Sequence, residues 1–438
     1  MLISCAGQAG LALGARLADM GISTLIVDKH GRLGDSWRSR YRSIKLNTPT
    51  YTDHYPFMRL PENWPRYLSQ DQVAYFAEHY GQLMGLDFLP NTNVTSVKYH
   101  KSERTYRVEA QTQNGARTFS ARHVVLATGV FSEEPNLPQF PGQDSFQGQL
   151  FHSSQHKSAR LVDNVNQKNV VVIGPGTSGH DVAQDFVNAG VKSVTIVQRH
   201  PIFSISADAS ETFQLNFWNT KGISTDEADV IGNSFPLAII RAFGVSLTQM
   251  ISAHDKVMLD GLKKAGVALR VGDDGVGLSD YQLIRGGHFY IDQGANEMII
   301  DGRIKFHRCE DGVKEVVPDG VVLADETKLN ADIIVLATGF QPSKLNVEKI
   351  MGQDVAQRLD DFGQLNTESE RNGVSCSLPQ ILRKELTRNP FQWWRNTGVP
   401  GFWYMTGSFM MCRQFSLPLA IQIAAVEKGL NKTYYQQQ

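Results

Sequence analysis

Glycines carry the clearest chemical signal in this sequence, because two clusters have the spacing of a dinucleotide-binding turn. Residues 174–179 read Gly-Pro-Gly-Thr-Ser-Gly and follow the apolar run 170–173. In such a turn the first glycine allows a tight bend, the second lets backbone approach a pyrophosphate, and the third lets helix and strand pack closely. Backbone N–H groups at the helix start then hold the phosphate charge. The predicted contacts to the dinucleotide are Gly174, Pro175, Gly176, Thr177 and Ser178.

The strand after this turn indicates which nucleotide the second site prefers. Residues 193–197 form an apolar run that ends in Gln198-Arg199-His200, with no carboxylate. An acid at this place would repel a 2′-phosphate, whereas an arginine attracts it. Arg199 taken alone would be a solvated surface charge, but its position at a strand end favours binding. We therefore expect NADPH at this site, held by Arg199 and His200.

The N-terminus repeats the pattern with one substitution. An apolar strand at 1–4, a helix at 11–20 and a second strand at 24–27 predict a βαβ unit. Residues 5–10 read Cys-Ala-Gly-Gln-Ala-Gly, so Cys5 stands where the first glycine belongs, and Asp28 is placed to bond the ribose of an adenosine. The alternative is an ordinary βαβ turn whose site Cys5 has abolished. The predicted contacts are Gly7, Gln8, Ala9, Gly10 and Asp28.

Two Ala-Thr-Gly turns suggest how the domains are connected. One ends the apolar run 124–129 and the other lies in 333–340, so they flank the second glycine cluster. They predict two returns of the chain to a shared core. The expected fold class is α/β, with two Rossmann-like dinucleotide-binding domains, one inserted into the other. The first domain would comprise 1–165 and 330–438, and the second 166–329, with a helical insertion around 201–300.

Composition excludes several classes of function. The 438 residues include 43 Lys+Arg and 44 Asp+Glu, a net charge of -1 that argues against a nucleic-acid surface. Cys5, Cys309, Cys376 and Cys412 form no Cys-x-x-Cys pair, so neither a dithiol centre nor a metal site is expected. The most apolar stretch, 401–426, is interrupted by Arg413, so no membrane span is expected. A soluble, cytoplasmic protein is the default interpretation.

Taken together, these segments resemble the flavin-containing monooxygenases, the class B flavoprotein monooxygenases of the N/S-oxygenating type. The resemblance covers essentially the whole chain and includes the segment 34–38, both Ala-Thr-Gly turns, and 146–156 with its Phe-x-Gly-x-x-x-His core. It implies FAD in the first domain, NADPH in the second, a return to the flavin at 401–408, and a last helix at 416–429. The further cofactor contacts that it implies are Lys29, Gly34, Trp37, Arg38, Asn47, Thr48, Val94, Ala127, Thr128, Gly129, Ala337, Thr338, Gly339, Gly407 and Ser408.

The resemblance also implies a mechanism. NADPH would reduce FAD, and a C4a-hydroperoxyflavin formed with O₂ would deliver one oxygen atom to a small, fairly apolar substrate at N, S or an activated carbon. Asn47 matches the asparagine that the family places beside the flavin, where an amide can donate a hydrogen bond to the peroxide or the nicotinamide. The alternative is a turn-forming asparagine before Thr48-Pro49.

Three departures from the family pattern leave alternatives open. Cys5 and a short first strand indicate either a missing upstream segment or weak FAD binding. His156 occupies a place where N/S-oxygenating members have Tyr or Phe and Baeyer–Villiger members have Trp. Residues 201–300 either shape the substrate entrance or form an extra packing layer or homodimer contact. The rival functions are therefore Baeyer–Villiger oxygenation of a ketone and a non-catalytic nucleotide-binding homologue with a decayed FAD site.

Overall fold

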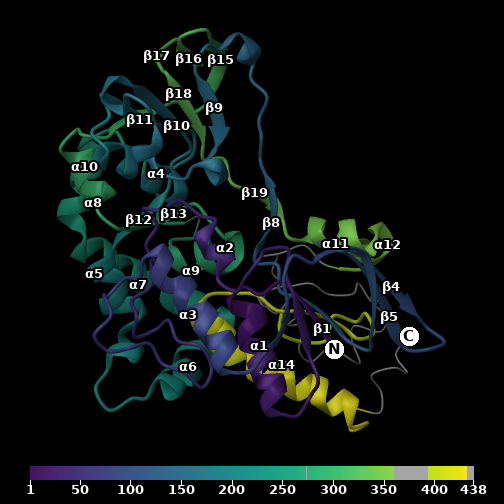
Figure 1. The fold of residues 1–438 in the computed structure, drawn as a ribbon. Helices are drawn as coiled ribbons and strands as arrows, with labels where there is room; N and C mark the ends of the chain where they lie inside the picture. Colours follow the sequence, from purple (N-terminus) through teal and green to yellow (C-terminus); the bar gives the residue numbers. More distant parts are fainter. Residues whose placement is uncertain (273, 360–392, 432–438) are drawn as a thin grey trace.

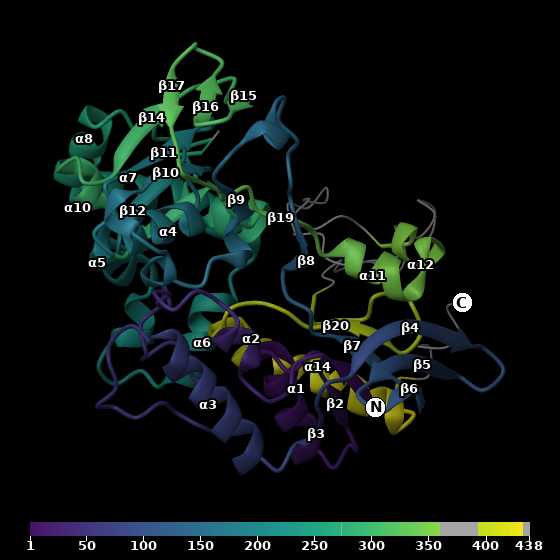
Figure 2. The same cartoon turned by 45° about the horizontal axis from the view of Figure 1, so that its top comes forward.

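The computed structural model describes residues 1–272, 274–359 and 393–431, which form two lobes (Figure 1). Each lobe is built around a five-stranded parallel sheet. The chain crosses between the lobes on β8 (Phe131–Pro135) and returns on β19 (Phe340–Pro342), which pair antiparallel. Figure 2 shows this pair between the two lobes. The path of the chain thus leaves the first lobe, builds the second lobe and returns to the first. Cys376 lies outside the described residues.

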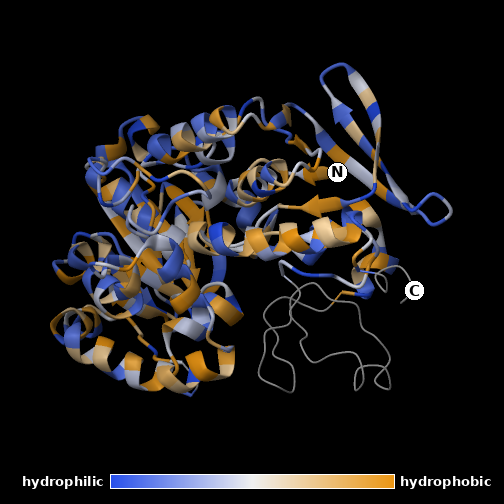
Figure 3. Ribbon diagram, turned by 90° about the horizontal axis from the view of Figure 1, so that it is seen from below, coloured by the Kyte–Doolittle hydropathy of each residue, from blue (hydrophilic) through white to orange (hydrophobic). Residues whose placement is uncertain are grey.

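The first lobe contains the predicted N-terminal βαβ unit. Its sheet has the order β20-β7-β1-β2-β3, and the strands beside the N-terminus are coloured as hydrophobic in Figure 3. The helix α1 (Gln8–Asp19) begins three residues before the predicted start, because the glycine-rich segment itself forms its first turn. The strands are β1 (Leu2–Ser4), β2 (Leu25–Val27), β3 (Asp87–Leu89), β7 (Val124–Leu126) and β20 (Phe402–Tyr404).

Additional elements cover the first sheet. The helix α14 (Phe409–Glu427) packs along α1, and it begins well before the predicted residue 416 because Ser408 accepts a hydrogen bond from the Met411 N–H as an N-cap. Pro418 is accommodated inside this helix. The other elements of the lobe are α2 (Asp35–Arg38), α3 (Gln70–Leu83), β4 (Asn93–His100), β5 (Thr105–Thr112), β6 (Gly115–Ala121), α11 (Lys344–Met351) and α12 (Gln353–Gln357).

The second sheet has the order β14-β11-β10-β18-β9 and corrects the predicted domain boundaries. Ile333 in β18 lies opposite Val170 in β10 on one side and Gln149 in β9 on the other. Both β9 and β18 therefore belong to the second sheet, although the boundaries at 165 and 330 placed them in the first domain. The elements are β9 (Gln149–His152), β10 (Asn169–Ile173), α4 (Thr177–Asn188), β11 (Ser193–Gln198), β14 (Lys305–Arg308) and β18 (Ile333–Leu336).

Residues 201–300 are largely helical. A two-stranded parallel ribbon of β12 and β13 runs beside the helices, and a three-stranded antiparallel sheet of β15, β16 and β17 follows. The elements are β12 (Phe203–Ser206), α5 (Ala207–Ala209), α6 (Thr225–Asn233), α7 (Leu237–His254), α8 (Lys256–Lys264), α9 (Leu278–Asp280), β13 (Phe289–Asp292), α10 (Ala295–Ile300), β15 (Val313–Val317), β16 (Gly320–Leu323) and β17 (Lys328–Asn330).

A buried ion pair fastens the helical insertion to the first lobe. Arg413 on α14 holds both oxygens of Asp229 on α6, with Nε–Oδ2 at 2.7 Å and Nη2–Oδ1 at 2.6 Å. Its Nη1 donates to the backbone oxygens of Thr52 at 2.7 Å and His54 at 3.1 Å. Each of the two charged side chains is only 4% exposed. The arginine that interrupts the apolar C-terminal run thus joins three segments of the chain.

Two regions pass a length and composition test for membrane spans. One is α14, and the other is the pair α6 and α7 taken together, which is bent by 93°. Half of the apolar window in α14 is buried inside the molecule, against α1 and the rest of the first core. Within the described structure α14 therefore serves as a core helix of the first lobe.

Removing one partner of the buried pair should destabilise the protein strongly. Asp229→Ala leaves Arg413 buried without its counter-ion, and we expect a loss of about 3–5 kcal/mol in the free energy of unfolding. Replacing both residues with leucine should cost less than Asp229→Ala alone. Urea unfolding measures both values, with Asp226→Ala on the exposed face of α6 as the control. A loss below about 1 kcal/mol for Asp229→Ala would contradict the anchoring role.

Candidate functional site

The two glycine turns have almost the same backbone geometry. The Cys5 N–H donates to Val27 O at 2.8 Å, and the Gly174 N–H donates to Val197 O at 3.0 Å. A Cβ at Gly10 would lie 2.0 Å from the Cys5 carbonyl oxygen, and one at Gly179 would lie 2.1 Å from that of Gly174. Only glycine therefore allows either helix to approach its strand this closely.

Both helix starts fit a phosphate. Gly7 and Gly176 are the N-caps of α1 and α4, with φ and ψ of -72° and -176° in one and -71° and -179° in the other. No side chain caps either helix, and neither first turn contains an acid. A Cβ at Gly176 would meet nothing within 4 Å, and one at Gly7 would meet only the Cys5 Sγ at 3.8 Å. Open space in front of uncapped N–H groups suits the pyrophosphate of a dinucleotide.

Cys5 adopts a backbone conformation that normally requires glycine. Its φ is +91°, and Gly174 at the equivalent position has a φ of +115°. A side chain at such a φ is strained by about 1–3 kcal/mol. Burial, with the nearby charge of Asp28, raises the pKa of the Cys5 thiol, so the sulfur stays protonated. The substitution therefore keeps the turn but fills part of it with a neutral thiol.

Asp28 is held in place by its neighbours. It accepts hydrogen bonds from the Ala6 N–H at 2.7 Å, the His30 N–H at 2.9 Å and the His30 imidazole at 2.6 Å. Burial opposes ionisation, but these hydrogen bonds hold the pKa of Asp28 below its usual value. A charged acceptor thus lies at the end of β2, where the ribose of an adenosine is expected.

Both Ala-Thr-Gly turns return to a glycine turn. The Ala127 N–H donates to Ser4 O at 2.9 Å, and the Ala337 N–H donates to Ile173 O at 2.8 Å. His152, in the Phe-x-Gly-x-x-x-His segment, lies with Nε2 3.1 Å from Gly339 O, which ties that segment to the second turn. These motifs therefore meet at the carboxyl ends of the strands, the edge at which α/β sheets bind ligands.

The loop with Asn47 and Thr48 lies beside a buried carboxyl group that the sequence analysis missed. Thr48 Oγ1 donates to the two oxygens of Asp53 at 2.9 and 2.7 Å, and Thr52 donates to one of them at 3.0 Å. Asp53 is 1% exposed, and burial raises its pKa to about 6 despite these hydroxyl groups. The half-buried Asn47 amide has no hydrogen-bond partner among the described residues.

Side chains near the Asn47 loop contact both the second lobe and the helical insertion. The Tyr41 hydroxyl donates to Asp181 on α4 at 2.6 Å, and burial raises the pKa of Asp181 to about 6. Glu211 in the insertion accepts from Tyr51 at 2.7 Å and from Arg66 Nε at 3.0 Å. The chain segment that bears Asn47 is thus fixed to α4, beside its glycine turn, and to the helical insertion.

Other predicted residues make contacts of their own. Gln8 Nε2 donates to Gly407 O at 3.1 Å, so Gly407 lies at the start of α1. Arg38 pairs with Asp35 and Glu78, and a Cβ at Gly34 would lie 2.3 Å from Ala74 O. Val94 lies on β4, and Lys29, next to Asp28, pairs with Glu133.

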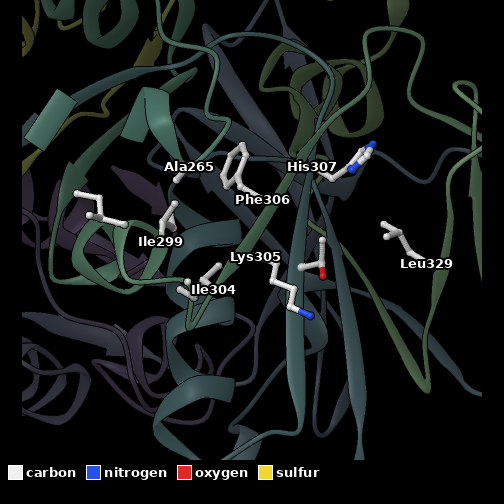
Figure 4. Close-up of a pocket in the computed structure, with 10 residues that line it drawn as sticks. Ala265, Ile299, Ile304, Lys305, Phe306, His307 and Leu329 are labelled. Carbon is white, nitrogen blue, oxygen red and sulfur yellow. The ribbon is translucent and has the colours of Figure 1, made fainter. Parts of the chain in front are cut away.

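A separate groove of about 430 Å³ lies along the edge strand β14 (Figure 4). Ile299, Ile304 and Phe306 line it, with the aliphatic part of Lys305. Its ten lining residues include none of the predicted cofactor contacts. The candidate site is therefore the region between the glycine turns and the Asn47 loop, not this groove.

Two parallel sheets with matching glycine turns, joined by a pair of antiparallel strands, define the fold class of proteins with two dinucleotide-binding domains. The chain belongs to the pyridine nucleotide-disulphide oxidoreductase family, whose model matches residues 2–229. It is 28% identical over 371 residues to an indole-3-pyruvate monooxygenase, YUCCA1, of Oryza sativa subsp. japonica, an alignment that covers 84% of this chain and 80% of the relative.

Solved structures show the same fold. A cyclohexanone monooxygenase matches with a TM-score of 0.67 at 17% identity, over 98% of this chain and 88% of the other. A flavin-containing monooxygenase from Stenotrophomonas maltophilia matches with a TM-score of 0.61 at 17% identity, over 97% and 98% of the two chains. The predicted fold class and the resemblance to flavin monooxygenases are confirmed, and the family match confirms that the chain is an oxidoreductase.

Cys5→Gly should relieve the strain in the first turn. We expect the free energy of unfolding to rise by about 1 kcal/mol and the fraction of protein that carries FAD to increase. Thermal unfolding and the flavin-to-protein absorbance ratio measure the two effects. Cys5→Ala is the matched control, because it removes the sulfur and keeps the strained Cβ. If alanine has the same effect as glycine, the sulfur and not the backbone limits binding.

Asp53 should make stability depend on pH. Its pKa is about 6 in the folded chain, above the value of about 3.9 expected when unfolded. Ionising the buried carboxyl therefore lowers the free energy of unfolding as pH rises from about 4 to about 6, and the loss persists above that range. Asp53→Asn should gain stability relative to the natural chain over this window, by up to roughly 2–3 kcal/mol. Urea unfolding at several pH values tests this, with exposed Asp71→Asn as control; a pH-independent difference would contradict it.

Proposed function

We propose that this protein is a monooxygenase that uses FAD and NADPH to insert one oxygen atom from O₂ into a small organic substrate. The observation that supports the proposal is that the chain segment bearing Asn47 contacts both lobes. Leu46 packs in the same apolar core as α1, while Tyr41 bonds to Asp181 on α4. A substrate at this loop would lie close to both cofactor sites.

Each part of the chain has a defined task in this proposal. The start of α1 would hold the FAD pyrophosphate, and the start of α4 that of NADPH. When bound, FAD supplies oxygen activation and NADPH supplies the hydride. The Asn47 amide, unpaired among the described residues, would orient the reacting oxygen by hydrogen bonding without releasing a proton. The Thr48–Asp53 contacts would fix the backbone beside that amide.

Baeyer–Villiger-type oxygenation beside a carbonyl is the second candidate. The matching relative is named for indole-3-pyruvate, a 2-oxo acid, and one structural neighbour for cyclohexanone. His156, at the position that differs between the branches, pairs with Asp185 at 2.8 Å in a buried site. That histidine therefore supports packing between β9 and α4 and favours neither branch.

Product analysis separates these functions. FAD-loaded protein would be incubated with NADPH, isotopically labelled O₂ and a panel containing a sulfide, a tertiary amine, cyclohexanone and indole-3-pyruvate. The proposal expects one labelled oxygen atom in the product of at least one member, as measured by mass spectrometry. If all NADPH consumption yields hydrogen peroxide, or if the protein takes up no FAD, the proposal fails and the non-catalytic alternative is favoured.

Asn47→Ala should uncouple the reaction. Losing one positioned hydrogen-bond donor should lower product formation by about 10²–10³-fold while flavin reduction by NADPH stays within about twofold. Hydrogen peroxide should rise in compensation. Asn93→Ala, at an exposed position on β4, is the matched control. Unchanged product yield per NADPH in Asn47→Ala would assign Asn47 to the turn alone.

A further inference from the structure

Basic residues from three separate segments lie near the second glycine turn. Ile202 bridges Leu269, and β12 pairs with β13 so that Phe203 lies opposite Phe289. The segment at residues 202 and 203 therefore runs between two neighbouring chain segments, with Arg270 on one and His288 on the other. The Arg270 N–H donates to Ile202 O at 2.9 Å, and the Phe203 N–H donates to His288 O at 3.0 Å.

The same strands touch the helix start that would hold the second dinucleotide. Thr177, the first residue of α4, donates to Phe289 O at 3.2 Å. At the end of β11, Arg199 Nε lies 3.0 Å from His200 Nε2. Burial, followed by the charges of Arg270, Arg285 and His200, lowers the pKa of His288 and favours its neutral form. The basic cluster of Arg199, His200, Arg270, Arg285 and His288 therefore lies between the end of β11 and the start of α4.

Arg270 contains an unused anion-binding edge. Its Nε and Nη2 are buried and have no hydrogen-bond partner in the described structure. The guanidinium carbon lies 4.7 Å from the centre of the Tyr281 ring, which fixes the plane of the group. Nε and Nη2 share one edge of a guanidinium, the edge that binds an oxyanion with two parallel hydrogen bonds. Arg413 uses this edge to hold Asp229.

Two buried guanidinium donors without partners are costly unless an acceptor joins them, and an anion is the acceptor that suits their charge. We infer that Arg270 binds the 2′-phosphate of NADPH together with Arg199, which lies at the end of β11. This inference rests on the proposed use of NADPH and adds a residue from the otherwise unassigned segment 201–300. A phosphate dianion suits the cluster better than a single carboxylate, because it offers more acceptor oxygens and up to twice the charge.

Nucleotide fragments test this assignment without catalysis. Calorimetry on the FAD-loaded full chain would measure the dissociation constants of 2′,5′-ADP and 5′-AMP for the natural chain, Arg270→Met and Arg270→Lys. We expect Arg270→Met to raise the dissociation constant of 2′,5′-ADP by at least about tenfold and that of 5′-AMP by less than about twofold. Arg270→Lys should fall between, because it keeps the charge and loses the two-pronged edge. Arg303→Met, at an exposed pair with Asp301, is the control.

Thermal unfolding gives an independent readout. Arg270→Met removes a buried charge without a partner, so its melting temperature without nucleotide should equal or exceed that of the natural chain. The added stability that 2′,5′-ADP confers on the natural chain should largely disappear in the variant. This opposite behaviour with and without ligand distinguishes a binding residue from a structural one, and it shows that the variant folds.

Three results would overturn the inference. Equal losses of affinity for 2′,5′-ADP and 5′-AMP in Arg270→Met would place Arg270 at the 5′-phosphate. Unchanged affinities for both nucleotides would remove Arg270 from the nucleotide site, and a lower melting temperature without nucleotide would give it a structural role. Failure of the proposed function is separable. A protein that binds 2′,5′-ADP through Arg270 but oxygenates no substrate keeps this inference and loses the monooxygenase proposal.

Discussion

The close approach of a strand end to a helix start is the constraint on which the rest of this structure depends. At both dinucleotide turns a glycine in the helix lies against a carbonyl oxygen, with room for no Cβ. This contact draws each helix onto its sheet and points its uncapped N–H groups into open space. Each Ala-Thr-Gly turn then closes on the same strand end. The chain builds this arrangement twice, once with Gly174 and once with a strained Cys5.

The space between the turns is organised by polar contacts between segments far apart in sequence. Arg413 with Asp229, and Glu211 with Tyr51 and Arg66, fasten the helical insertion to the first lobe. Tyr41 with Asp181 connects the Asn47 segment to the second lobe. Because Arg413 and Asp229 are buried, removing either of these two partners costs more than their contact itself contributes. The insertion is therefore an integral part of the wall around the candidate site.

Local patterns predicted the glycine turns and the alternation of strands and helices, whereas the return of the segment 401–408 was implied by the family resemblance. Helix starts were misplaced at α1 and α14 because a glycine-rich segment and a serine cap lie where the apolar periodicity has not yet begun. Strands β9 and β18 were assigned to the wrong sheet, since chain order does not specify which strands pair across an inserted domain.

The contacts that position the site could not be predicted from the sequence. Asp53, Asp181, Glu211 and Arg270 are ordinary charged residues in sequence, and their roles follow from burial and from partners up to 160 residues away. Asp53 lies six residues after Asn47, and an acidic residue this close to the loop was the signal that the sequence offered. Arg270 has no comparable signal, because its significance is an absence of partners among the described residues.

In the proposed function, the two turns would hold FAD and NADPH close enough for direct electron transfer between flavin and nicotinamide. Anaerobic mixing of FAD-loaded protein with NADPH, followed by visible absorbance, tests it most directly. The account predicts that NADPH bleaches the flavin, that NADH does so more weakly at equal concentration, and that air restores the oxidised spectrum. A protein that binds both nucleotides while its flavin spectrum stays unchanged on adding NADPH would contradict it.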